Sequence, residues 1–143
     1  MIIRKSSAEW RGDLKSGAGN IALGSGAYNG PYSFQSRFES GTGTNPEELI
    51  AAAHAGCFSM AFSFALTQAG FTAESVRSTA AVKLEPAPGG GFAITGIHLE
   101  MTASIPGIAE AQFQEIAAAA KAGCPVSKAL AAVPITLSAT LAA

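Results

Sequence analysis

The sequence predicts an α+β fold in which antiparallel sheets surround one long central helix. A helical stretch runs from Pro46 to Gln68 without a breaker, strand-like segments precede and follow it, and two further helical segments and one strand end the chain. Because strands and helices do not alternate regularly, a parallel βαβ series is not expected. The chain has 143 residues, of which 48% are hydrophobic, and this predicts a single domain, 1–143.

The N-terminal segments have the composition of strands. Ile2 to Trp10 and Gly19 to Leu23 are separated by turn-forming residues, which favours a hairpin. Residues 32–38 then alternate apolar and polar side chains, so we expect a further strand there. In that strand the aromatic side chains would share one face, and Arg37 would point to the other.

The long helix has clear start and stop signals. Thr44 or Asn45 can cap its N-terminus, Pro46 suits its first turn, and two glutamates follow where the helix dipole favours negative charge. Gly70 can end the helix. The resulting helix is about 34 Å long, enough to cross a small domain.

A membrane span is an alternative reading of this helix, because Leu49 to Leu66 carries no charge and has about the minimum length. However, the stretch is rich in alanine and is interrupted by His54, Ser59 and Ser63. No Lys or Arg flanks it closely, as membrane anchoring would favour. We therefore expect a buried helix with no membrane partner, and Cys57 on a face that looks inward.

The segments after the helix predict a second, longer hairpin. Val76 to Leu84 and Phe92 to Ile105 have strand composition and are joined by a loop rich in proline and glycine. The alternation of apolar residues in the second strand changes phase near Gly96. A β-bulge is expected at that point.

Two helices and a strand complete the prediction. Ala109 to Ala122 is amphipathic, and Pro125 favours a short helix over Val126 to Ala131 with Cys124 at or near its cap. Ile135 to Leu141 alternates as a closing strand.

Charge and targeting signals narrow the class of protein. The net charge is −1 and no run of Lys or Arg occurs, so neither a nucleic acid nor an anionic membrane surface is an expected partner. The N-terminus lacks the apolar core of a signal peptide, and a cytoplasmic location is expected. In that compartment, two cysteines are better suited to a redox pair, a metal site or two inert thiols than to a permanent disulfide.

Local electrostatics favour Cys124 as the more reactive thiol, because a helix N-terminus stabilises a thiolate. Cys57 would then be its partner, and it would need a nearby cation in order to ionise. Arg37 is the candidate cation, although an arginine on a strand is commonly a solvated surface residue. A zinc site formed by His54, both cysteines and a carboxylate has acceptable ligand types, but neither cysteine belongs to a C-x-x-C pair.

Three motifs carry a family resemblance: GTNPEEL at 43–49, AAHAGCFSMA at 52–61 and KAGCPVSKAL at 121–130. Together they resemble the OsmC/Ohr family, the osmotically inducible protein C and organic hydroperoxide reductases, and most of all its OsmC branch. The likeness extends over nearly the whole chain.

The resemblance implies an intertwined α+β homodimer that reduces organic hydroperoxides, and hydrogen peroxide, in oxidative and osmotic stress. It assigns peroxide attack to Cys57, resolution to Cys124, and support of the thiolate to Arg37 and Glu47. It implies no metal and no bound cofactor, only an external dithiol reductant. This order of the cysteines reverses the electrostatic one, and we adopt it because tertiary structure can bring an arginine to Cys57.

Two other classes remain open: a non-enzymatic thiol redox sensor, and a stress-response binding protein with unreactive thiols. The resemblance also raises a geometric question, because Glu47 and Cys57 are ten residues apart on one helix, or about 15 Å. A glutamate side chain cannot span that distance. We therefore expect Glu47, with Arg37, to reach Cys57 of a second subunit across a two-fold axis. The sequence assigns no role to Glu48 or His54.

Overall fold

The computed structural model describes residues 1–142 and has an α+β fold, as predicted. In chain order the elements are β1 (Ser6–Arg11), β2 (Ala18–Leu23), β3 (Asn29–Tyr32), α1 (Phe34–Phe38), α2 (Pro46–Gln68), β4 (Ser75–Pro86), β5 (Phe92–Ser104), α3 (Glu110–Gly123), α4 (Pro125–Ala129) and β6 (Ile135–Leu141). Contacts divide the chain into two compact units, one of residues 1–49 and one that begins at Ile50. That the whole chain acts as one domain stays a prediction.

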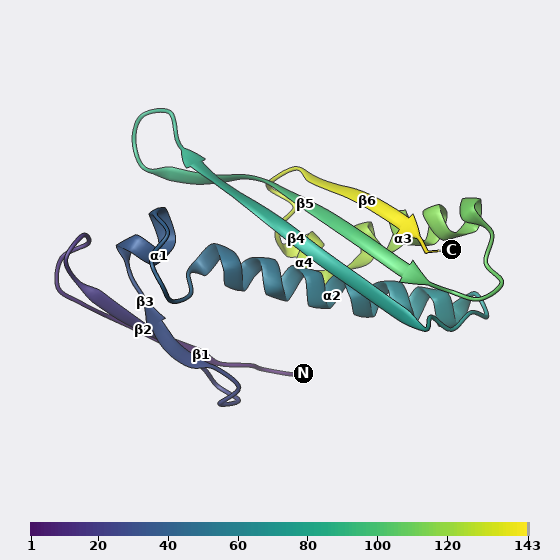
Figure 1. Ribbon diagram of the computed structural model, residues 1–143, viewed down its shortest axis with the longest axis horizontal. Helices are drawn as coiled ribbons and strands as arrows, with labels where there is room; N and C mark the ends of the chain where they lie inside the picture. The colour runs from purple at the N-terminus through teal and green to yellow at the C-terminus, as the bar shows by residue number, and fades with distance from the viewer. Residues whose placement is uncertain (143) are drawn as a thin grey trace. The chain divides into compact units, whose positions relative to one another are not determined.

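The N-terminal unit contains an antiparallel sheet with the strand order β1-β2-β3 (Figure 1). β1 pairs with β2 from Ser6 opposite Leu23 to Arg11 opposite Ala18, which confirms the predicted hairpin. The first strand is shorter than expected, because residues 1–5 lie outside it.

The expectation of a strand across residues 32–38 is wrong. β3 ends at Tyr32, the first residue of this segment, and Phe34–Phe38 forms the short helix α1. Ser33 and Ser36 form a capping box in which the Ser33 Oγ accepts from the Ser36 N–H at 3.1 Å and the Ser36 Oγ accepts from the Ser33 N–H at 2.8 Å. Arg37 therefore does not project from a strand face but lies in the last turn of α1.

The long helix α2 has the predicted bounds, Pro46–Gln68. At its start, the Asn45 Oδ1 accepts a hydrogen bond of 2.8 Å from the N–H of Glu48, as a helix-capping side chain does. At its end, Gly70 has a φ of 88°, in the left-handed region that glycine adopts without a side-chain clash. The local capping signals in the sequence are therefore those used in the structure.

The C-terminal unit contains a second sheet with the strand order β4-β5-β6. β4 and β5 form the predicted antiparallel hairpin. Lys83 pairs with Gly96 and Leu84 pairs with Ile94, so Thr95 has no opposite residue. This confirms the bulge expected near Gly96.

The expectation that all pairings are antiparallel is wrong for β6, which runs parallel to β5. The reason is the connection between the two strands. The helices α3 and α4 return the chain to the end of the sheet where β5 began, and a parallel pair needs such a crossover.

Helices α2, α3 and α4 lie on one face of the second sheet, and the core is formed between them (Figure 1). The buried residues of this core are Phe58, Phe62, Leu66, Leu99, Met101, Ala103, Ile105, Phe113, Ala117, Ala120 and Cys124. Phe62 meets Phe113 edge to face, with ring centroids 5.7 Å apart. Each fully buried large side chain contributes about 1.5–3 kcal/mol to stability.

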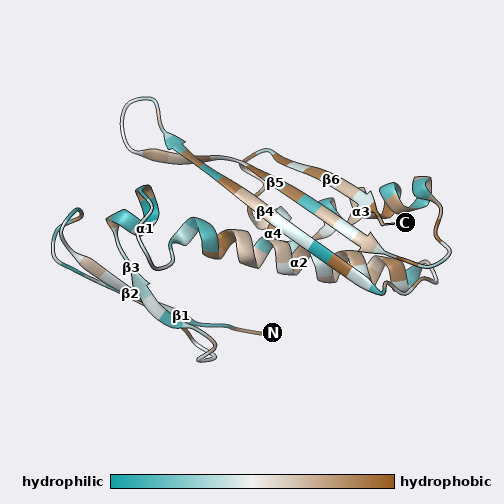
Figure 2. Cartoon of the chain, viewed as in Figure 1, coloured by the Kyte–Doolittle hydropathy of each residue, from teal (hydrophilic) through white to brown (hydrophobic). Residues whose placement is uncertain are grey.

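On its opposite side, α2 carries exposed apolar side chains in the described part of the chain. Met60 and Phe64 are 76% and 66% exposed, and Figure 2 shows apolar residues around the middle of the helix. Among the described helices, α2 alone is long and apolar enough to cross a membrane, with 22% of its most apolar stretch buried. Core helices of soluble proteins pass the same test of length and composition. The expectation of a helix buried on all sides is therefore not met within one chain.

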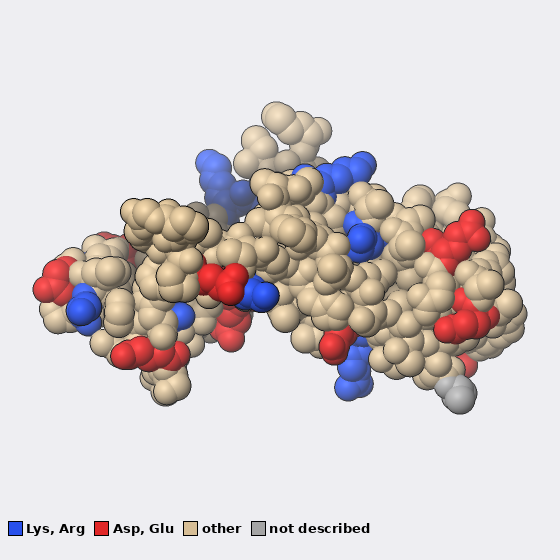
Figure 3. Space-filling model, turned by 90° about the horizontal axis from the view of Figure 1, so that it is seen from above, with Lys and Arg blue, Asp and Glu red and all other residues tan. Residues whose placement is uncertain are grey.

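Charged side chains are sparse on the surface. On the face seen in Figure 3, acidic and basic residues are interspersed among uncharged ones, and no extended patch of one sign is visible in the described part of the chain. This distribution is consistent with the net charge of −1.

Candidate active site

The two cysteines meet in the C-terminal unit although they are far apart in the sequence. Cys57 lies near the middle of α2, and Cys124 lies between α3 and α4. Their Sγ atoms are 2.8 Å apart, and both thiols are free. Cys57 is partly exposed, whereas Cys124 is completely buried.

The backbone around Cys124 explains why its sulfur is held in place. Cys124 has φ −58° and ψ 125°, so it ends α3 and caps the start of α4. Its N–H donates to the carbonyl of Ala120 at 2.9 Å, and its own carbonyl accepts from the N–H of Lys128 at 3.0 Å. Pro125 occupies the first turn of α4, where a missing N–H has no cost. The residue is thus tied to both helices.

The surroundings of the two sulfurs differ in their effect on ionisation. Burial raises the pKa of Cys57, and donation of its S–H to Cys124 raises it further, against a weaker opposing hydrogen bond from the Val126 N–H. Burial also raises the pKa of Cys124, but hydrogen bonds from Cys57 and from the N–H and hydroxyl groups of Ser127 outweigh it and lower that pKa. Within this pair the thiolate is therefore favoured at Cys124, as the helix-cap argument predicts.

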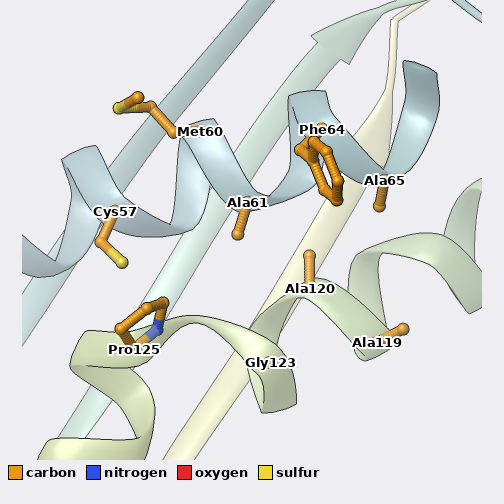
Figure 4. Close-up of a pocket in the computed structure, with 9 residues that line it drawn as sticks. All are labelled: Cys57, Met60, Ala61, Phe64, Ala65, Ala119, Ala120, Gly123 and Pro125. Atoms are coloured by element: carbon orange, nitrogen blue, oxygen red, sulfur yellow. The ribbon is translucent and has the colours of Figure 1, made fainter. Parts of the chain in front are cut away.

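A groove of about 620 Å³ opens beside Cys57 (Figure 4). The residues that line it come from α2, α3 and the start of α4: Cys57, Met60, Ala61, Phe64, Ala65, Ala119, Ala120, Gly123 and Pro125. Apart from the thiol, every lining side chain is apolar or absent. Such a lining suits an apolar ligand, and Cys57 is the only one of the two cysteines on its wall.

Arg37 and Glu47 meet in the N-terminal unit as a bidentate ion pair. The Arg37 Nε lies 2.9 Å from the Glu47 Oε1, and Nη2 lies 3.0 Å from Oε2. Glu47 is buried, and the guanidinium also lies over the ring of Phe38, 5.2 Å from its centroid. This double hydrogen bond holds the guanidinium plane in one orientation, a geometry that a lysine could not provide.

The four residues predicted for the site thus form two pairs, a thiol pair in one unit and an ion pair in the other. Sequence reasoning missed a further contact. His54 Nε2 lies 2.8 Å from Ser127 Oγ, and both residues are buried. The spacing was a usable signal, because His54 precedes Cys57 by three residues and Ser127 follows Cys124 by three.

Metal binding is not indicated by side-chain clustering. Within residues 1–142, no three His, Cys, Asp or Glu side chains are grouped so that they could hold a metal ion. His54 and the two cysteines therefore do not form such a group among the described residues.

Comparisons with known proteins identify the family of this chain. The model of the family described as OsmC-like protein matches residues 39–138. Peroxiredoxin OsmC of Escherichia coli is 52% identical over 130 residues, which cover 90% of each chain. An organic hydroperoxide resistance protein of Xanthomonas axonopodis is 33% identical over 94 residues, covering 62% of this chain and 61% of the relative.

A solved structure supports the same assignment. The crystal structure of an organic hydroperoxide resistance protein OsmC from Legionella pneumophila superposes with a TM-score of 0.73 at 25% identity, covering 98% of this chain and 99% of the solved one. The resemblance carried by the three sequence motifs is therefore confirmed. Both the family match and the 52% identity over nine tenths of the chain establish that this protein belongs to the OsmC family.

Proposed function

We propose that this protein is a thiol-dependent peroxidase that reduces organic hydroperoxides, and hydrogen peroxide, to alcohols or water. The observation that carries the proposal is the pair of free thiols 2.8 Å apart, one of which lines an apolar groove. The names of the E. coli and Xanthomonas relatives, a peroxiredoxin and an organic hydroperoxide resistance protein, support the same reaction class.

Cys57 is assigned the attack on peroxide because a substrate can reach it. Cys124 is the better stabilised thiolate, but its side chain is completely buried and lies off the groove wall. A buried nucleophile cannot meet a bulky hydroperoxide. Because the pKa of Cys57 is raised in the described chain, its ionisation requires a cation, and we assign that role to Arg37 oriented by Glu47.

The proposed reaction oxidises the protein once, in two chemical steps. The Cys57 thiolate attacks one peroxide oxygen, the O–O bond breaks, and the leaving alkoxide takes a proton to become the alcohol. Cys57 is then a sulfenic acid. The Cys124 thiolate attacks the sulfenic sulfur, an S–S bond forms, and hydroxide leaves and is protonated to water. An external dithiol reopens the disulfide by exchange, so no bound cofactor is needed.

A homodimer with shared active sites belongs to the same proposal. Glu47 and Cys57 are ten residues apart on α2, so a glutamate cannot reach the thiol of its own helix. Two copies of α2 packed antiparallel would cover Met60 and Phe64 and would bring the ion pair of one chain to Cys57 of the other. This arrangement gives the exposed side of α2 a protein partner in a cytoplasmic protein, rather than lipid.

The test is turnover with purified protein. With dithiothreitol as the dithiol, the protein should consume many equivalents of cumene hydroperoxide, and Cys57→Ser should abolish consumption. A sensor would stop after one equivalent, and inert thiols would consume none. Either of those results would refute the peroxidase assignment.

A further inference from the structure

His54 is a buried polar side chain that the proposed reaction does not use. It lies one helical turn before Phe58 on the core side of α2 and has no exposed surface. Its Nε2 is 2.8 Å from Ser127 Oγ, while its Nδ1 is buried and has no hydrogen-bond partner in the described chain. Burying an imidazole nitrogen without a hydrogen-bond partner lowers the stability of the fold, so a histidine at this position calls for an explanation.

Ser127 connects this histidine to the thiol pair. Its side chain is buried in the first turn of α4, the turn that Cys124 caps, and its hydroxyl and N–H groups lower the pKa of Cys124. One end of this turn therefore meets His54, 2.8 Å from the Ser127 Oγ, and the other end meets Cys57, whose sulfur is 2.8 Å from that of Cys124. All four groups lie in the same compact unit.

Ser127 has a single hydroxyl proton, and this proton sets the direction of the hydrogen bonds between His54, Ser127 and Cys124. If Ser127 donates to Cys124, its oxygen must accept from His54, so Nε2 carries the hydrogen and Nδ1 is a bare lone pair. The reverse arrangement would remove a donor from Cys124 and would leave a buried Nδ1–H without an acceptor. Orphaned buried donors are rarer than orphaned acceptors. No described carboxylate contacts the ring, and burial lowers its pKa, so the imidazole is neutral.

We propose that His54 and Ser127 are positioning residues for the resolving step, forming a donor chain that holds Cys124 as a thiolate aimed at Cys57. The proposal rests on the roles assigned to the two cysteines above. In the step concerned, the Cys124–Cys57 S–S bond forms, the S–O bond of the sulfenic acid breaks, and the leaving hydroxide is protonated to water. The donor chain touches Cys124 and not the peroxide-facing thiol, so it acts on the second step and not on the first.

A single-turnover experiment separates the two steps. Reduced full-length protein receives one equivalent of cumene hydroperoxide, and peroxide loss and the 57–124 disulfide are followed by rapid quench and mass spectrometry. Ser127→Ala should slow disulfide formation by at least tenfold, as loss of a hydrogen bond to a charged group predicts, and should change peroxide loss less than twofold. His54→Leu should have a similar effect, and adding it to Ser127→Ala should cause no further slowing.

Two controls distinguish positioning from a structural role. His54→Gln can place an amide N–H near the position of Nε2 and should restore most of the resolving rate. Ser59→Ala removes another partly buried hydrogen bond between side chains, from Ser59 to Ser78 at 2.7 Å. This variant should leave the rates of both steps unchanged. Equal slowing of both steps, or disulfide formation at the wild-type rate in the His54→Leu and Ser127→Ala proteins, would overturn the proposal.

A measurement on unmodified protein keeps the test independent of variant folding. Nitrogen-15 NMR of His54 should show the neutral tautomer with hydrogen on Nε2, and the Nδ1–H tautomer or an imidazolium at pH 7 would refute the donor chain. If wild-type protein consumes peroxide without forming the 57–124 disulfide, the assigned cysteine roles fail. If the disulfide forms in wild type, and His54→Leu and Ser127→Ala proteins form it at the same rate, only the proposed roles of His54 and Ser127 are refuted.

Discussion

Acidification should destabilise this protein through His54, because the folded chain holds that ring neutral. Burial lowers the pKa of His54 in the folded state, while the unfolded chain titrates near the ordinary value of about 6.5. Below that pH the unfolded state binds the extra proton, so unfolding becomes more favourable as the pH falls. Between pH 7.5 and 5.5, a group that stays neutral in the folded state throughout removes at most about 1.4 kcal/mol from the free energy of unfolding.

The matched comparison is wild type against His54→Gln, which cannot titrate but keeps an N–H for Ser127. Urea unfolding is measured at both pH values and at one protein concentration, because association would shift the apparent stability. The carboxylates, the thiols and His98 are present in both proteins, so their titrations cancel in the difference. Wild type should lose more free energy of unfolding than the variant, by up to about 1.4 kcal/mol. An equal loss in the two proteins would show that His54 is protonated in the fold, and the neutral donor chain would be refuted.

The remaining predictions concern the peroxide reaction and the dimer. Cys124→Ser should permit one oxidation and then accumulate sulfenic or sulfinic acid at Cys57, detectable by mass spectrometry; sustained turnover would contradict its resolving role. Arg37→Met should slow peroxide attack about tenfold in stopped-flow assays, as a rise of one unit in thiol pKa predicts, and an unchanged rate would make Arg37 purely structural. Phe64→Asp should lower the preference for cumene hydroperoxide over hydrogen peroxide and weaken association measured by sedimentation; a stable dimer would place the interface elsewhere. Refolding Cys57→Ser together with Glu47→Gln protein should restore activity, unless each site is built from one chain.

Local signals in the sequence were sufficient for α2 but not for α1. Caps at Asn45 and Gly70 are short-range features, and the helix bounds follow from them. In residues 32–38 the same aromatic spacing fits two structures, because Phe34 and Phe38 are four residues apart and their rings lie 5.0 Å apart on one side of a helix. The capping box at Ser33 decides between them, and period-two alternation alone does not reveal it.

Longer-range features required information beyond local patterns. The direction of β6 depends on how α3 and α4 carry the chain back, which strand composition does not encode. The cysteines were paired through the family resemblance, while local electrostatics alone ranked Cys124 first, in agreement with the pKa directions of the folded chain. Access from the groove, on which the proposed assignment of peroxide attack to Cys57 rests, is a tertiary property. The contact between His54 and Ser127 depends on the same packing of α4 against α2.

The short separation between the two sulfurs has a consequence for the protein's tolerance of oxidant. Closing a 2.8 Å gap to a bond of about 2.05 Å needs a displacement smaller than an atom's radius, so no helix has to unwind between oxidation and resolution. A second peroxide molecule must reach the sulfenic acid before that small displacement occurs in order to cause irreversible damage. We therefore expect inactivation per turnover to rise only at high peroxide concentrations. Such a thiol pair is suited to removing peroxide when its concentration rises suddenly, and poorly suited to sensing how high that concentration is.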